Sequence, residues 1–213
     1  MESPASSPRN AVVVAVALMA IAAAENTVAP WAPFYFVYAA LTLVLPLALG
    51  AVKIGRPALP RWPHWIAAVV VAVGLQLAFR PLADAVDLAG MFGTVFAAAG
   101  LRLKHPPDDV GRSYLLFIVV WAALGEELFY RGYLQARLRR RYGAATAIGV
   151  AAFLFAIRHY TQVLLAWPQI PWWPATIWVT VAFVLGVAIG WLYEKSASLL
   201  PPIACHYLFN LLG

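Results

Sequence analysis

The chain has 213 residues, which is enough for one domain. Hydrophobic residues make up 63% of it and charged residues 11%, whereas about a quarter of a typical soluble domain is charged. This composition excludes a water-soluble globule and predicts an integral membrane protein. The formal net charge of +6 does not indicate a nucleic-acid partner, because Lys and Arg cluster in short loops beside apolar runs, where they anchor membrane topology.

Eight apolar runs predict an all-α, polytopic helical bundle with about seven or eight membrane segments. Pro, Gly or charged residues separate the runs, and neither β-type alternation nor an internal repeat is present. A full crossing needs about 20 apolar residues, so some of these segments are expected to be short or re-entrant. The runs are 11–24, 34–52, 66–79, 88–101, 114–124 with the carboxylates that follow, 144–157, 177–193 and 203–212.

The first run, 11–24, has the length of a signal-peptide core. It leads through Glu25 and Asn26 directly into another long apolar run, and we therefore expect a retained first helix. The sequence is rich in Ala and uses Arg rather than Lys, which is typical of bacterial proteins. The expected location is the bacterial inner (cytoplasmic) membrane.

Two basic loops predict the orientation. They lie at 53–61 and 137–141, and the positive-inside rule places both on the cytoplasmic side. Three runs separate these loops, and three crossings would put them on opposite sides. The weakest of the three is 88–101, which is short and contains three glycines, so we expect it to be re-entrant or interfacial and the N-terminus to be inside. The tryptophan-rich segment 166–174 then lies outside, where a Trp belt suits the interface.

Two adjacent carboxylates, Glu126 and Glu127, lie in the helix that continues the run from residue 114. Such residues are costly in a bilayer unless they face water or a partner. Glu127 and Arg131 are four residues apart, so they share a helical face and are expected to pair. Glu126 lies about 100° round the helix, and its own four-apart neighbour is the uncharged Tyr130. Glu126 therefore has no charged partner on its own helix and is the carboxylate available for a catalytic role.

Three further polar residues are expected at membrane depth. His159 follows Arg158 at the end of an apolar helix, and His206 and Asn210 are four apart on one helical face. Singly, each has a structural explanation such as an interhelical hydrogen bond. Together with Glu126 they are better explained by one catalytic site, in which a carboxylate and an imidazole activate a water while a histidine and an asparagine donate to an oxyanion. The set predicts hydrolysis of an amide bond.

Zinc is the alternative within the enzyme class, with Glu126, His159 and His206 as ligands and a water in the open position. The spacing differs from His-Glu-x-x-His, where two ligands share a helix. A cysteine nucleophile is disfavoured, because Cys205 and His206 are adjacent and their side chains diverge by about 100°. As the single cysteine, Cys205 permits no internal disulfide.

Two functions other than proteolysis are also compatible with the sequence. One is a membrane scaffold or immunity protein that binds a peptide. The other is a proton-coupled transporter, in which buried Glu and His residues relay protons. Formation of a defined cleavage product separates the protease from both.

Three motifs occur in order along the second half of the chain. They are Glu-Glu-x-x-x-Arg at 126–131, Phe-x-x-x-His at 155–159 and His-x-x-x-Asn at 206–210. With these motifs the chain resembles the CPBP family of intramembrane proteases (CAAX prenyl endopeptidases and bacteriocin-processing proteins, also called Abi). The resemblance covers 113–213 as a catalytic core, whereas 1–112 supplies helices without motifs.

The resemblance implies a glutamate-dependent endopeptidase that acts on a membrane-associated protein or peptide without a cofactor. The expected cleavage lies near the C-terminus of the substrate and in the cytoplasmic half of the bilayer. A suspected similarity to the branch that accompanies bacterial exosortases implies a C-terminal sorting helix as the substrate. Arg158 departs from the family pattern, where a small or apolar residue is more usual, and it could partner Glu126. By resemblance, Glu126 and His159 activate the water, His206 and Asn210 form the oxyanion hole, and Glu127 and Arg131 brace the site.

Overall fold

The structure is a computed structural model that describes residues 7–28, 36–49, 59–88, 90–91, 94, 123–164 and 169–212. Within these ranges every regular element is a helix and no strand occurs, which confirms the predicted all-α class for the part of the chain described. The helices are α1 (Pro8–Val28), α2 (Phe36–Ala48), α3 (Trp62–Ala85), the π-helix η2 (Leu128–Gln135), α7 (Ala136–Tyr142), α8 (Ala144–Arg158), α9 (Tyr160–Val163), α10 (Trp172–Ser196) and α11 (Leu200–Leu212).

Three of the described helices are long and apolar enough to cross a membrane. They are Pro8–Glu25 within α1, Trp62–Ala85, which is α3, and Trp172–Ser196, which is α10. Val37–Ala48 and Ala144–Ile157 are shorter apolar helices. Large apolar side chains face outward from these helices, as lipid contact allows and water would not. The chain is therefore an integral membrane protein by its helices.

The described residues do not establish the predicted number of seven or eight membrane segments, because several of the predicted runs lie partly or wholly outside them. The run 88–101, expected to be re-entrant or interfacial, lies mostly outside them. The apolar run that begins at residue 114 is described only from residue 123, where an α-helical stretch leads into η2.

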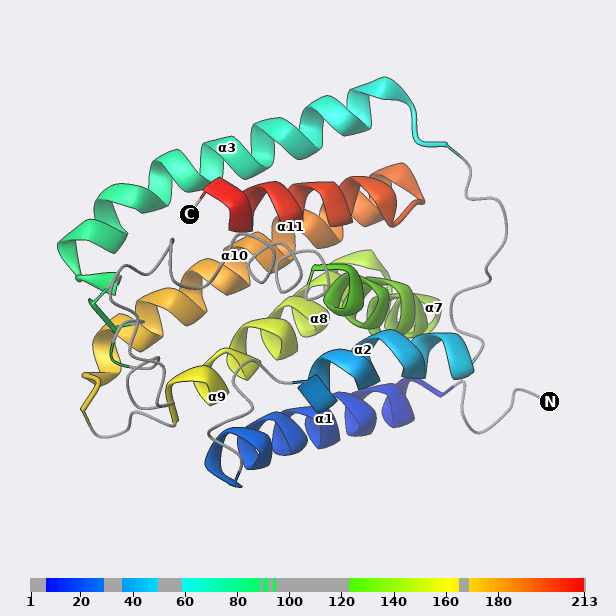
Figure 1. Ribbon diagram of the computed structural model, residues 1–213. Coiled ribbons are helices and arrows are strands. Elements are labelled where there is room, and N and C mark those ends of the chain that lie inside the picture. The colour runs from blue at the N-terminus through cyan, green and yellow to red at the C-terminus, as the bar shows by residue number, and fades with distance from the viewer. Residues whose placement is uncertain are drawn as a thin grey trace.

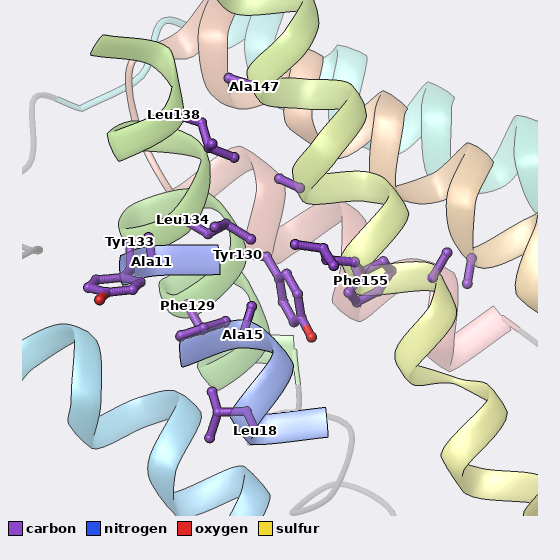
Figure 2. Close-up of a cluster of buried hydrophobic side chains, with 14 of the residues drawn as sticks. Ala11, Ala15, Leu18, Phe129, Tyr130, Tyr133, Leu134, Leu138, Ala147 and Phe155 are labelled. Carbon is purple, nitrogen blue, oxygen red and sulfur yellow. The ribbon is translucent and has the colours of Figure 1, made fainter. Parts of the chain in front are cut away.

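The helices run roughly along one common direction (Figure 1). One buried cluster joins α1, α2, η2 and α8, and a second joins α3, α10 and α11. In the first cluster, the rings of Tyr130 in η2 and Phe155 in α8 pack edge-on, with their centroids 5.3 Å apart (Figure 2). The two clusters meet where α8 packs against α10. The helix that contains the carboxylates is therefore surrounded by protein.

The π-helix η2 begins directly after the two carboxylates. All eight of its residues are buried, although Arg131 and Gln135 are among them. Such i→i+5 turns are rare and occur often at functional sites. Nothing in the apolar pattern of this segment predicts the widened turn.

Two glycines allow α10 to approach its neighbours closely. A Cβ atom at Gly186 would lie 3.1 Å from the Cα of Ala152 in α8. A Cβ at Gly190 would lie 2.9 Å from Oε1 of Gln135, whose Nε2 donates to the Gly190 carbonyl at 3.0 Å. The small-xxx-small face at 186–190 thus provides close helix packing, as the sequence predicts.

A tight turn between α10 and α11 sets the position of α11. Ala197 ends α10 in the left-handed region (φ 50°), and Ser198 Oγ accepts a hydrogen bond from the Leu200 N–H at 3.3 Å. Pro201 and Pro202 follow in the first turn of α11, where a missing N–H leaves no helical hydrogen bond unmade. This turn sends α11 back through the bundle toward the carboxylates.

Candidate active site

Glu126 and Glu127 are buried in the helix that leads into η2, with exposed fractions of 4% and 0%. Their side chains contact different partners, as their adjacent positions on a helix require. Glu127 faces Arg131 and α11, whereas Glu126 faces the end of α8. The predicted division of the two carboxylates is therefore present, although each has a cation.

Glu127 forms the predicted ion pair with Arg131. The Arg131 Nε atom lies 3.1 Å from Glu127 Oε2, and both side chains are completely buried. His206 Nδ1 donates to the other oxygen, Oε1, at 2.9 Å. The Arg131 guanidinium also lies over the Phe155 ring, 5.2 Å from its centre. These contacts tie η2, α8 and α11 together around one carboxylate.

Glu126 receives its cation from another helix. The Nη2 atom of Arg158, the last residue of α8, contacts Glu126 Oε1 in a buried ion pair. The expectation from helical spacing that Glu126 is a lone carboxylate is therefore wrong, whereas the pairing of Arg158 with Glu126, which the departure from the family pattern suggested, is confirmed. Helical spacing reports only neighbours on the same helix, and Arg158 is 32 residues away along the chain. The aromatic ring of Tyr38 lies 4.9 Å from the Arg158 guanidinium carbon and supports it by a cation–π contact.

His159 is held in one orientation at the end of α8. The Phe155 carbonyl can only accept, so His159 Nδ1 donates to it at 2.9 Å. In the neutral ring, Nε2 is then an acceptor, and it takes a hydrogen bond from Arg158 Nη2 at 3.2 Å. The rings of Phe155 and Trp178 pack edge-on against the imidazole, with centroid distances of 4.9 Å and 5.5 Å. Arg158 thus links the carboxylate of Glu126 to the imidazole of His159.

His206 lies between the two carboxylates. While Nδ1 is bound to Glu127, Nε2 lies 3.8 Å from Glu126 Oε2. Asn210 follows one turn later on the same face of α11 and is half-buried. The structure therefore brings Glu126, His159 and His206 into one cluster, with Asn210 adjoining it along α11.

A comparison with known protein families finds a match to the second half of the chain. Residues 111–212 match a family described as type II CAAX prenyl endopeptidase Rce1-like, and all three motifs fall within the match. Through these residues the second half of the chain is similar to the CPBP family of CAAX proteases. The match implies intramembrane protease activity, a protein substrate and a membrane environment. No curated protein and no solved structure matched the chain.

Zinc does not fit this arrangement of the CAAX-protease motifs. The three candidate ligands would have to direct lone pairs at a single point. Instead, Arg158 places an N–H group against both Glu126 Oε1 and His159 Nε2, and a guanidinium there opposes a divalent cation. In the part of the chain that the structure describes, no group of three His, Cys, Asp or Glu side chains has the spacing of a metal site.

The sequence did not indicate the contribution of α2 to the CAAX-protease site. The Tyr38 hydroxyl lies 3.2 Å from that of Tyr130, and the backbone N–H groups of Val37 and Tyr38 donate to the Glu25 carboxylate at 3.0 and 3.2 Å. Glu25 thus satisfies free N–H groups at the start of α2, where a negative charge is favourable. An acid placed before an apolar helix is the sequence signal that could have suggested this role.

Proposed function

We propose that the protein is an intramembrane endopeptidase that hydrolyses a peptide bond near the C-terminus of a membrane-associated protein, with Glu126 as the general base. The observation that carries this proposal is the meeting of the three motifs at one buried point. In particular, Glu126 Oε2 lies 3.8 Å from His206 Nε2, although 80 residues separate them in the sequence. Structural ion pairing alone accounts for the Glu127–Arg131 contact but does not require a second carboxylate, an arginine and two imidazoles beside it.

The two oxygens of Glu126 have different roles in the proposed reaction. Arg158 engages Oε1, so Oε2 is the proton acceptor. A water at Oε2 loses a proton to the carboxylate as its oxygen attacks the carbonyl carbon of the substrate. The protonated Glu126 then passes this proton to the departing amine nitrogen, and the C–N bond breaks. The carboxylate is regenerated, and one water is consumed for each bond cleaved.

Donors around Glu126 are suited to the charge that develops on the carbonyl oxygen. Asn210 offers an amide N–H group, and His206 offers Nε2–H when it is protonated. Arg158 supplies a permanent positive charge beside them. In the described arrangement His159 Nε2 accepts from Arg158, so His159 contacts the water when the guanidinium turns toward the oxyanion. This motion would let Glu126 and His159 act on one water, as the family resemblance implies.

The proposal is tested with purified protein in liposomes and a membrane-anchored substrate that carries a C-terminal helix. We expect a defined product by mass spectrometry from the wild type and none from Glu126→Gln, which keeps the size of the side chain but removes the base. Retained turnover by a folded Glu126→Gln variant would disprove the role of Glu126. Binding without any product would favour a scaffold instead.

Metal dependence is tested in the same assay. We propose that no metal is required, because Arg158 supplies the positive charge beside Glu126 and His159. Cleavage is expected to continue after treatment with a chelator such as EDTA. Activity that is lost with the chelator and restored by zinc would instead support the ligand set Glu126, His159 and His206.

A further inference from the structure

Helix α2 lies outside the segment that matches the family, yet it packs directly against the helix that carries Glu126. A Cβ atom at Gly125, the residue before Glu126, would lie 2.8 Å from Thr42 Oγ1 and 3.4 Å from the Ala39 carbonyl oxygen. Glycine at this position therefore allows the backbone of α2 to approach the helix of the two carboxylates closely. The family match begins only at residue 111, so it does not include this neighbour of the site.

Tyr38 of α2 supplies the surface on which the Arg158 guanidinium lies. The guanidinium carbon is 4.9 Å from the centre of the Tyr38 ring, which is within the range of a cation–π interaction. Both side chains are buried, so water screens this attraction little. The Tyr38 hydroxyl lies 3.2 Å from that of Tyr130, and the Tyr38 backbone N–H donates to Glu25 at 3.2 Å. Tyr38 is therefore held both at its backbone and at its hydroxyl.

The Arg158 side chain reaches the catalytic carboxylate through Nη2. This atom contacts Glu126 Oε1 and lies 3.2 Å from His159 Nε2. Arginine often binds a carboxylate through two parallel N–H···O bonds, which would occupy both carboxylate oxygens. In the proposed reaction Glu126 Oε2 accepts the proton of a water, so it has to stay accessible to that water. The contacts of the guanidinium with the Tyr38 ring and with His159 oppose its rotation into the two-bond arrangement.

We propose that Tyr38 is a positioning residue of the active site. Its ring holds the Arg158 guanidinium so that Nη2 contacts Glu126 Oε1, and Oε2 is thereby left to accept the proton. Without the ring, the guanidinium would turn onto both carboxylate oxygens and block the base. This inference rests on the proposed function and extends it beyond the matching segment. The first half of the chain then supplies a functional part of the site as well as membrane helices.

Steady-state kinetics of two Tyr38 variants test this role in liposomes with the membrane-anchored substrate. Tyr38→Phe keeps the ring and should keep kcat close to that of the wild type. Tyr38→Leu removes the ring and should lower kcat on the order of 10- to 100-fold with KM unchanged, because a misplaced group costs turnover and not binding. Tyr38→Met replaces Tyr38→Leu if that variant does not fold. A wild-type kcat in the variant without the ring, or an equal loss in Tyr38→Phe, would overturn the inference.

Tyr133→Leu is the matched control for the loss of a buried tyrosine beneath an arginine. Tyr133 is 1% exposed and Tyr38 is 2% exposed, and the Arg137 guanidinium carbon lies 3.9 Å from the centre of the Tyr133 ring. Arg137 Nη1 donates to the Tyr133 carbonyl at 3.4 Å and not to Glu126. Both substitutions should lower Tm, whereas only Tyr38→Leu should lower the kcat of folded protein. Equal decreases in kcat would show that Tyr38 has only a structural role.

A double variant separates this inference from the proposed function. Because Tyr38 acts through Arg158, adding Tyr38→Leu to Arg158→Met should lower kcat and Tm by less than the sum of the two single effects. Arg158→Gln replaces Arg158→Met if that variant does not fold. Additive decreases in Tm, which are measured without substrate, would overturn the inference whether or not the protein cleaves a substrate. If the Tm effects are coupled and the wild type cleaves nothing, the Tyr38–Arg158 contact stands, and the proposed protease function fails together with the positioning role.

Discussion

Removing the Arg131 guanidinium should destabilise the protein far more than removing an equivalent surface arginine. Arg131 and Arg139 each place Nε 3.1 Å from Oε2 of a glutamate, Glu127 and Glu194 respectively. The first pair is fully buried, whereas the Arg139 side chain is 50% exposed. The two pairs therefore have the same separation and differ in burial, which makes Arg139→Met a matched control for Arg131→Met.

The expected magnitudes follow from that difference. A buried pair that loses one partner costs about 3–5 kcal/mol, because a charge remains without compensation. Glu127 would keep the hydrogen bond from His206 Nδ1, so we expect about 3 kcal/mol for Arg131→Met. An exposed pair contributes about 0–1 kcal/mol, which is the expected loss for Arg139→Met. For a chain of this length, about 3 kcal/mol corresponds to a decrease in Tm on the order of 10 °C.

Thermal unfolding in detergent, followed by tryptophan fluorescence, measures both variants. A double variant, Glu127→Gln with Arg131→Met, removes both charges and should recover most of the loss, because it leaves no uncompensated buried charge. Equal decreases in Tm for Arg131→Met and Arg139→Met would refute the reasoning. So would a double variant that is less stable than Arg131→Met alone.

Three further outcomes are expected. Glu126→Gln should lower kcat by about 10²–10⁴-fold, the usual contribution of a general base, and a single-turnover assay on folded protein checks this. Gly186→Ala should cost about 1–3 kcal/mol, because its Cβ would press on Ala152, whereas Gly149→Ala meets no atom within 4 Å and should gain about 1 kcal/mol. Two unchanged Tm values would contradict this account of the α8–α10 contact. Glu25→Gln should cost about 0.5–2 kcal/mol by weakening the cap of α2, as hydrogen exchange at the Tyr38 amide would show; unaltered exchange would rule out the cap.

The features that the sequence predicts correctly are those that one helix can determine by itself. Composition alone excludes a soluble protein, because a chain with so few charges cannot cover its surface in water. The spacing of Glu127 and Arg131 brings them together on the same helix and predicts their ion pair. The small residues at 186–190 predict a close helix contact, because a glycine leaves room for a neighbouring backbone. The motif order predicts the family, since it is a property of the chain and not of its packing.

Packing between helices decided the rest. Whether Glu126 has a cation depends on how α8 is rotated against η2, and that rotation brings in Arg158. His206 can bridge two carboxylates only because the turn after α10 returns α11 to the centre of the bundle. The depth at which α8 and α10 pack decides which residue of α10 meets His159, and that residue is Trp178. Local periodicity contains no information on these contacts, because each joins residues on separate helices whose relative rotation and depth are set by the whole buried interface.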